Sequence, residues 1–225
     1  MIKDSPATTG TRPRRGRPPA TTPHEIQLAA LDLFQRNGYD ETSVEDIAAA
    51  VGIGRSTFFS YFRSKSSVIW YDLDENHRRL VDALAAVDRS LPVMDAILEA
   101  VLRTIIYDED DRVFYRDRNR LVFSHPVLSV EINGVTGRWA PSIADAVRER
   151  AGAKVHPALP LAIGYAAVGA IAAALTLWSD ASTGTTGPRG LVRWALEPVV
   201  GSFQTTLDRG ADGFPQPPAP GVVVA

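Results

Sequence analysis

The stretch TPHEIQLAALDLFQRNGYDETSVEDIAAAVGIGRSTFFSYFRSK, residues 22–65, decides the fold. Its first part has helical spacing of apolar residues, at Ile26, Ala29, Ala30, Leu33 and Phe34. Thr22 followed by Pro23 predicts the start of this helix. Asn37 and Gly38 predict its end, because both residues tolerate the left-handed conformation of a helix stop.

Two shorter helices are predicted to follow. The second begins after Thr42 or Ser43, since each lies three residues before an acidic residue and fits a capping box. The segment 52–54, Gly-Ile-Gly, predicts a turn with Ile53 as its apolar plug, and the third helix covers residues 55–62. Three short helices with a glycine-containing turn before the last form a helix-turn-helix, which places one helix in the DNA major groove.

The third predicted helix carries small hydroxyl groups and an arginine that can meet base edges, and Tyr61 and Lys65 suit phosphates. We expect Phe58 and Phe62 in the core. An ordinary solvated face is the alternative for the polar residues. The expected DNA contacts in this motif are Thr42, Ser43, Arg55, Ser56, Thr57, Ser60, Tyr61 and Lys65.

A basic arm precedes the motif at residues 1–20. Its Arg15-Gly16-Arg17-Pro18 segment has the composition of a minor-groove hook, because glycine lets the backbone lie in the narrow groove between two guanidinium groups. A disordered, solvated tail is the alternative. The position of the arm directly before a helix-turn-helix favours DNA contacts by Arg15 and Arg17.

The run from Leu28 to Val68 resembles the DNA-binding domain of TetR-family transcriptional regulators. The residues that carry the resemblance are Gly38-Tyr39, Thr42-Ser43-Val44-Glu45-Asp46-Ile47-Ala48 and residues 51–65. One departure is Phe59, where the family usually has tyrosine, so Tyr61 would supply the phenol instead. The resemblance implies an all-α protein with an N-terminal helix-turn-helix domain and a larger helical domain for ligand binding and dimerisation.

Charge is unevenly distributed along the 225-residue chain, whose net charge is −2. Residues 1–65 hold 9 Lys and Arg against 7 Asp and Glu, whereas residues 66–225 hold 15 against 19. The positive charge therefore lies in the part expected to meet DNA. The chain has no cysteine, which excludes disulfides and thiolate sites. Its N-terminus lacks the apolar stretch of a signal peptide, so we expect a cytoplasmic protein.

Helical patterns continue beyond the motif, and all of them are read from apolar spacing and from proline and glycine positions. The expected helices cover residues 68–87, a stretch from Pro92, residues 112–123 up to a break at His125-Pro126, residues 138–151, residues 155–179, and a stretch from Pro188. The expected regions are a disordered arm at 1–20, the helix-turn-helix at 21–66, a larger domain at 67–210, and a disordered tail at 211–225.

The segment 155–179 has no Lys, Arg, Asp or Glu, which suits a membrane span by composition. Its alanine and glycine content, and the prolines at 157 and 160, instead favour a helix that another helix approaches closely. We therefore expect no membrane association. In the resembled family the last two helices form a four-helix interface across a two-fold axis, which implies a homodimer and a palindromic DNA operator.

The resemblance also implies a small-molecule pocket in the larger domain, where ligand entry changes the spacing of the two recognition helices. Long apolar helices would line it and suit a small hydrophobic ligand. The expected lining aromatics are Tyr107, Phe123, Trp139, Tyr165 and Trp178, with ordinary core packing as the alternative for each.

An arginine-rich segment at 112–120 suggests a more specific ligand. Arg116 and Arg120 beside aromatic residues could bind the phosphates and adenine of a coenzyme A thioester; a solvated helix paired with nearby carboxylates is the alternative. A second resemblance, to regulators encoded beside mycofactocin biosynthesis genes, rests on Trp70, residues 116–120, Pro126-x-Leu128 and Arg138-Trp139. Because many members of the wider family respond to acyl-CoA, a long-chain acyl-CoA is the first hypothesis. A different apolar or aromatic ligand, for a regulator of an efflux or catabolic operon, stays open.

Enzymatic function finds no support in the sequence. The four histidines, at 24, 77, 125 and 156, fit no metal-binding spacing, and no nucleophile elbow, P-loop or dinucleotide motif occurs. We therefore expect no catalytic residue, metal or cofactor. A membrane-surface or interaction module is the remaining competitor, and it would bind acidic lipids without preference among DNA sequences.

Overall fold

The computed structural model describes residues 21–105, 112–152, 155–180 and 187–210, and its regular elements there are all helical. This confirms the all-α prediction. The expected arm, with Arg15 and Arg17, and the expected tail lie outside the described residues. The elements are α1 (Pro23–Asn37), α2 (Val44–Ala50), α3 (Arg55–Tyr61), the 3₁₀ helix η1 (Ser66–Val68), α4 (Leu73–Ala86), α5 (Val93–Thr104), α6 (Arg112–Ser124), α7 (Pro126–Thr136), α8 (Trp139–Ala151), α9 (Ala158–Ser179) and α10 (Pro188–Arg209).

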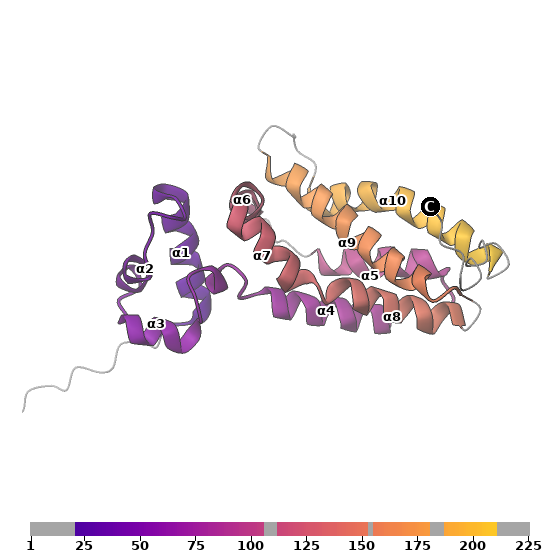
Figure 1. The fold of residues 1–225 in the computed structure, drawn as a ribbon, viewed down its shortest axis with the longest axis horizontal. Coiled ribbons are helices and arrows are strands. Elements are labelled where there is room, and N and C mark those ends of the chain that lie inside the picture. Colours follow the sequence, from indigo (N-terminus) through magenta and orange to yellow (C-terminus); the bar gives the residue numbers. More distant parts are fainter. Residues whose placement is uncertain (1–20, 106–111, 153–154, 181–186, 211–225) are drawn as a thin grey trace, which may run out of the picture.

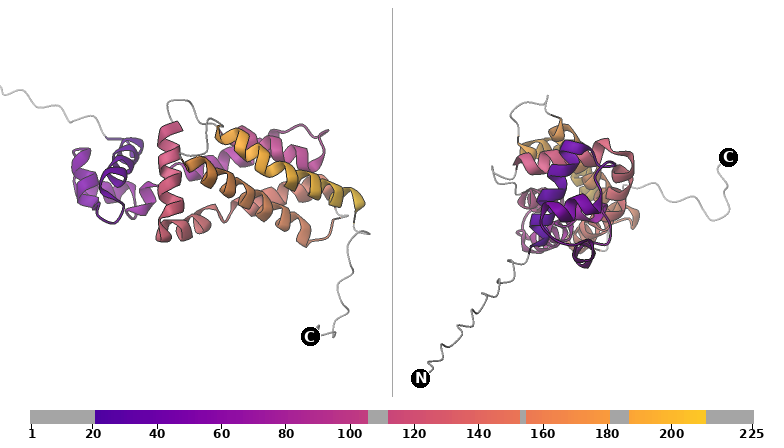
Figure 2. Two further views of the ribbon diagram at one scale, coloured as in Figure 1. Left: turned by 90° about the horizontal axis from the view of Figure 1, so that it is seen from above. Right: turned by 90° about the vertical axis from the view of Figure 1, so that its left-hand side faces the viewer.

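The helices form a small unit at one end and a long bundle beside it (Figure 1). The small unit contains α1, α2 and α3, and the bundle contains α4, α5, α8, α9 and α10. Within the bundle, α9 packs against both α8 and α10, while α4 and α10 each pack against α5. Helix α6 crosses the end of the bundle that faces the small unit, and it contacts both α1 and α9 (Figure 2).

Local sequence signals set the ends of α1 and α2. Thr22 and Glu25 form a capping box at α1, and Gly38 ends that helix with a φ of +92°. At α2 the capping box is formed by Ser43 and Asp46. Of the two predicted N-cap residues, Thr42 and Ser43, the helix therefore uses Ser43. The Ser43 hydroxyl and then its backbone N–H hold the pKa of Asp46 below its ordinary value.

The prediction of a single helix over residues 68–87 is wrong, because α4 begins only at Leu73. A tighter segment precedes it. The N–H of Ile69 donates to the carbonyl of Ser66 at 2.9 Å, and the N–H of Leu73 donates to the carbonyl of Trp70 at 3.0 Å. These bonds span three residues rather than four, so the chain winds as 3₁₀ turns before α4 starts.

Helix α7 was not predicted from the sequence. We expected His125-Pro126 to end one helix, but Pro126 also lies in the first turn of the next, where the missing N–H has no helical partner to lose. The N–H of Ser129 donates to the carbonyl of His125 at 2.9 Å. The helix brings the fully buried Leu128 into the core.

Two clusters of buried side chains stabilise the fold. The first surrounds Ile26, Ile47 and Phe58 in the small unit, and it also takes Val122 from α6 and Leu128 from α7. The second fills the bundle with residues of α4, α5, α8, α9 and α10. Helices α6 and α7 therefore attach the small unit to the bundle through apolar packing. The division of the chain at residues 66 and 67 stays a prediction.

Helix α9 begins at Ala158 rather than at residue 155. Among the described helices it alone has the length and mean hydropathy, 2.0, that a membrane crossing needs. One face of α9 packs against neighbouring helices, where Ile163, Ala167 and Trp178 are buried, while Leu161 and Leu177 are exposed. Gly164 permits the close approach to α8: a Cβ there would lie 2.9 Å from the carbonyl carbon of Ala140 and closer still to its oxygen.

Candidate DNA-binding surface and effector cavity

The exposed face of α3 displays the residue types predicted to meet DNA. Phe58 and Phe62 are buried and anchor the helix, as expected. Gly52, with a φ of +69°, turns the chain into α3. The exposed side chains are Arg55, Ser56, Thr57, Phe59, Ser60 and Tyr61.

Neighbouring groups hold this face in place. Arg55 pairs with Glu45 of α2 at 2.5 Å, and its guanidinium lies 5.5 Å from the centre of the Phe59 ring. The hydroxyl of Tyr61 donates to the carbonyl of Thr21 at 3.1 Å. Because Thr21 directly follows the basic arm, the arm joins the folded chain next to the exposed face of α3.

Thr42 does not lie on this surface. It is 1% exposed, and its hydroxyl donates to the carbonyl of Gly38 at 2.8 Å. Lys65 is also engaged inside the protein, because its Nζ donates to the carbonyls of Tyr39 at 2.7 Å and Thr42 at 3.0 Å. Both residues close the loop between α1 and α2. Ser43 is exposed at the start of α2, where it forms the capping box.

A cavity of about 490 Å³ lies among α4, α6, α7, α8 and α9 and the end of α5. Of the aromatic residues expected to line it, Phe123, Trp139 and Tyr165 do so. The polar residues of its wall are Asn76, Thr104, Arg118, Asn119, Ser129, Asn133, Thr136 and Thr176. The rest of the wall is mainly apolar, which is typical of a small-molecule site.

Arg116, Arg120 and Trp178 do not line this cavity. Trp178 is fully buried, and the Arg116 guanidinium lies 5.4 Å from the centre of its ring. Arg120 donates from Nε to the carbonyl of Ser179 and from Nη1 to Asp117, each at 3.1 Å. These arginines hold α6 against the end of α9. Tyr107, also expected at the site, lies outside the described residues.

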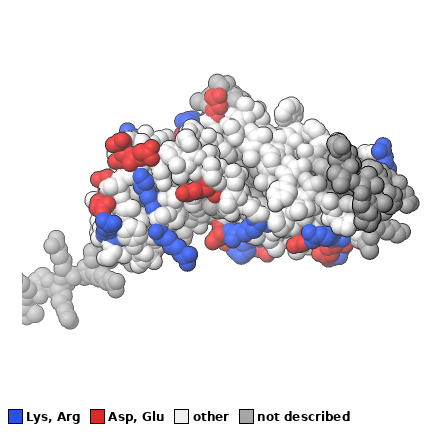
Figure 3. All heavy atoms as spheres, in the orientation of Figure 1, with Lys and Arg blue, Asp and Glu red and all other residues white. Residues whose placement is uncertain are grey.

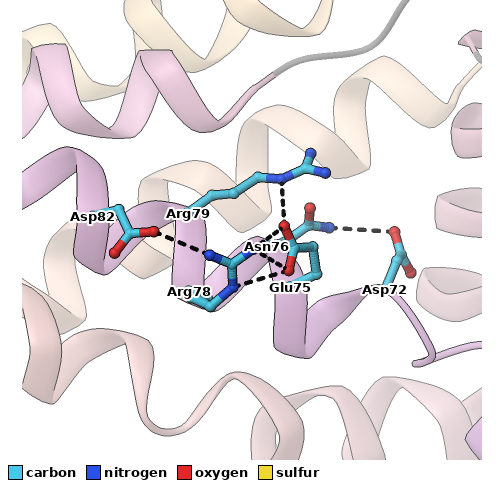
Figure 4. Close-up of polar contacts among 6 residues, drawn as sticks. All are labelled: Asp72, Glu75, Asn76, Arg78, Arg79 and Asp82. Atoms are coloured by element: carbon cyan, nitrogen blue, oxygen red, sulfur yellow. Dashed lines mark hydrogen bonds and ion pairs between the residues drawn. The ribbon is translucent and has the colours of Figure 1, made fainter.

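Sequence reasoning missed the ion pair at the cavity wall. Arg118 of α6 is buried, and its Nη1 lies 2.5 Å and 2.7 Å from the two carboxylate oxygens of Asp72. Asn76 donates to the same carboxylate at 3.2 Å (Figure 4). Nothing in the spacing of Asp72 and Arg118 could identify this pair, since it joins elements 46 residues apart.

The same carboxylate reaches the small unit. The side-chain amide of Gln27, which is 1% exposed in α1, donates to Asp72 at 3.3 Å and to the carbonyl of Ile69 at 3.5 Å. A chain of contacts therefore runs from the cavity wall through Arg118 and Asp72 to α1. A second connection is made by His125, whose Nε2 lies 3.3 Å from the Asp40 carboxylate in the loop after α1.

Comparison with known proteins agrees with both halves of the structure. Residues 26–69 match the family of bacterial regulatory proteins named for tetR, and residues 91–195 match the MftR C-terminal domain. A protein of Mycobacterium tuberculosis named as the mycofactocin biosynthesis transcriptional regulator MftR is 32% identical over 165 residues, which cover 73% of this chain and 83% of that protein.

Solved structures share the fold at lower identity. The fatty acid degradation regulator FadR of Bacillus halodurans aligns with a TM-score of 0.54 and 16% identity, over 85% of this chain and 97% of that one. A TetR-family regulator of Streptomyces coelicolor aligns with a TM-score of 0.50 and 18% identity, over 83% and 88% of the two chains. The matches along the sequence show that this chain belongs to the TetR family, whose members are transcriptional regulators and not enzymes.

Proposed function

We propose that this regulator is a cytoplasmic repressor that binds a palindromic operator as a homodimer and is released by a small hydrophobic ligand in the cavity. The first ligand candidate is a long-chain acyl-CoA. The observation that carries this proposal is the set of contacts from Arg118 through Asp72 to Gln27. These contacts connect the cavity wall to α1 of the DNA-binding unit, so a ligand in the cavity could act on α1 through them.

Release would follow from a change in the spacing of the two α3 helices of a dimer. Recognition helices on a palindrome must lie about 34–36 Å apart to enter successive major grooves. A ligand that binds better to a conformation with another spacing shifts the population away from the DNA-binding form. Because α6 contacts α1 and also forms part of the cavity wall, its displacement would reposition the small unit.

The DNA-binding surface in this proposal consists of α3 and the start of α2, together with the arm residues Arg15 and Arg17. Thr42 and Lys65 do not contact DNA in this proposal, and they stabilise the loop between α1 and α2. The name of the Mycobacterium tuberculosis relative makes DNA near mycofactocin biosynthesis genes a suitable first operator to test.

The ligand proposal rests on the size and lining of the cavity. Its apolar wall suits an acyl chain. Arg116 and Arg120 lie outside it on α6, so a coenzyme A head group would have to meet them on the surface. A regulator of an efflux or catabolic operon with a different apolar ligand is the second candidate, favoured by the aromatic side chains of the cavity wall.

The dimer proposal rests on an apolar face. Leu161 and Leu177 of α9 are 38% and 46% exposed, and Trp194 of α10 is 72% exposed. The surface over the middle of the bundle is almost free of charged side chains in the view of Figure 3. A second copy of this chain would cover such a face with its own α9 and α10.

Replacing Trp194 by arginine should convert the dimer to a monomer, as measured by light scattering coupled to size-exclusion chromatography. The side chain is exposed, so the substitution leaves the fold intact while it places a charge in the proposed interface. Val130 provides the matched control because it is 71% exposed on α7. A dimeric Trp194→Arg protein, or a monomeric Val130→Arg protein, would contradict this placement.

Replacing Arg55 by alanine should weaken operator binding by about 1–3 kcal/mol, the range expected for a base-reading side chain. Arg79→Ala is the control, because Arg79 is also an exposed helical arginine paired with a glutamate, on α4 (Figure 4). Fluorescence anisotropy with labelled operator measures both. Equal operator affinities of the two variants would contradict the proposed role of α3 as the recognition helix.

A further inference from the structure

One aromatic side chain of α3 lies outside the core, on the proposed DNA-binding surface. Phe58 and Phe62 are buried, whereas Phe59 is 42% exposed. Its ring carries no hydroxyl, amide or cationic group, which are the groups that bind phosphate oxygens. The exposed ring therefore needs an apolar partner if it contacts DNA, and such a contact would remove its surface from water.

Neighbouring side chains fix the position of the Phe59 ring. It meets the ring of Phe58 edge to face, with centroids 5.5 Å apart and an angle of 89° between the planes, which is a favourable arrangement of two aromatic rings. The Arg55 guanidinium lies 5.5 Å from the Phe59 centroid, and Arg55 is paired with Glu45 of α2. Because Arg55 and Phe59 are four residues apart, they share one side of α3, at the edge that faces α2.

The major groove of DNA offers one kind of apolar group on its base edges. Guanine, adenine and cytosine present hydrogen-bond donors and acceptors there, whereas thymine also presents the methyl group on its C5 atom. A phenylalanine ring is among the side chains that suit this methyl group. Burying one such group against the ring raises the affinity about fourfold.

A second exposed aromatic side chain of α3, Tyr61, differs from Phe59 in its chemistry and its placement. It is 41% exposed, but its hydroxyl donates to the carbonyl of Thr21 at 3.1 Å. Tyr61 lies two residues after Phe59, and residues with this spacing do not face the same side of a helix. Tyr61 therefore provides a matched control of nearly equal exposure.

We infer that Phe59 recognises a thymine in each half of the operator, through contact of its ring with the thymine methyl group. This rests on the proposed function, because it specifies what α3 reads in the DNA. The hydroxyl of the tyrosine that the family usually has at this position is absent here. The side chain has thereby lost its means of binding a phosphate and kept the apolar ring that suits a thymine.

The test compares two labelled DNA fragments from upstream of the gene for this chain, one with thymine and one with uracil at every thymine position. Uracil lacks only the methyl group and keeps the same hydrogen-bonding groups. Fluorescence anisotropy measures the affinity of the full-length protein for each fragment. The native protein should bind the thymine fragment about ten- to fifteenfold more tightly, because a dimer reads two half-sites at about fourfold each.

Three variants assign this preference to one side chain. Phe59→Ala should bind the two fragments with affinities within about twofold of each other. Phe59→Tyr keeps the ring and should keep the preference for thymine. Tyr61→Ala should weaken binding to both fragments and leave the ratio of the two affinities as in the native protein.

The outcomes separate this inference from the proposed function. Equal binding of the two fragments by the native protein, or a full preference for thymine in Phe59→Ala, would overturn the thymine contact and leave α3 as the recognition helix. Loss of the preference in Tyr61→Ala would also overturn it. No preference of the native protein for the upstream fragment over unrelated DNA would overturn the proposed operator and the thymine contact together. Circular dichroism checks the folding of the variants, and the comparison of fragments on the native protein needs no variant.

Discussion

Asp72→Ala should lower the free energy of unfolding by about 3–5 kcal/mol, the range for breaking a buried ion pair from one side. Its partner Arg118 has a side chain 6% exposed and would keep its charge in a site where Asp72 no longer compensates it. The substitution also removes the acceptor for the buried amide of Gln27. Urea denaturation at one fixed protein concentration measures the change.

The matched control is Asp74→Ala. Asp74 lies two residues after Asp72, in the first turn of α4, and also pairs with an arginine from a distant segment, Arg138. Here the carboxylate is 83% exposed and the arginine 45%, so the pair contributes at most about 1 kcal/mol. Similar losses for the two variants would show that the Asp72 pair is not buried in solution, and would remove the proposed route from cavity to α1.

Gly164→Ala should destabilise the protein by about 3 kcal/mol, at the upper end of the usual cost of overpacking. The added Cβ would overlap the carbonyl group of Ala140, which is helix backbone and cannot rotate away. Relief requires α8 and α9 to separate, and both helices form part of the cavity wall. Thermal unfolding should therefore show a lower midpoint, and ligand affinity should fall with it.

Gly134→Ala in α7 is the control for this substitution. Apart from its two chain neighbours and the backbone of its own helix turns, no atom lies within 4 Å of the position that a Cβ would occupy there. Alanine is favoured over glycine in a helix by up to about 1 kcal/mol, so this variant should be as stable as the native protein or slightly more so. A Gly164→Ala protein as stable as Gly134→Ala would mean that α8 and α9 pack less closely than described.

The helix-turn-helix could be predicted from the sequence because its signals are local. Thr22-Pro23, the Ser43 capping box and the glycine at 52 act within a few residues, and each determines a helix end or a turn. The apolar faces around Phe58 follow from helical spacing alone. Local signals failed at Pro126, because the same residue that ends one helix is also favourable in the first turn of another.

The cavity was less predictable because its wall depends on pairings between distant helices. Composition alone could not show that Arg116 and Arg120 hold α6 against α9, while Arg118, between them, lies at the cavity wall and pairs with Asp72. Neighbours in sequence point to different sides of a helix, and only the fold decides which side meets a cavity. Phe123, Trp139 and Tyr165 lie at the cavity wall, as large aromatics on apolar helices commonly do, and their contact with a ligand stays a prediction.

The most direct test of ligand-relieved DNA binding uses fluorescence anisotropy of a labelled DNA fragment from upstream of the gene for this chain. The fragment is titrated with the protein and then with palmitoyl-CoA. Ala172→Phe, which places a ring at the cavity wall, serves as the variant. We predict that both proteins bind the DNA and that palmitoyl-CoA releases the native protein but not the variant. Equal release of both, or no release of the native protein, would contradict an acyl-CoA effector in this cavity.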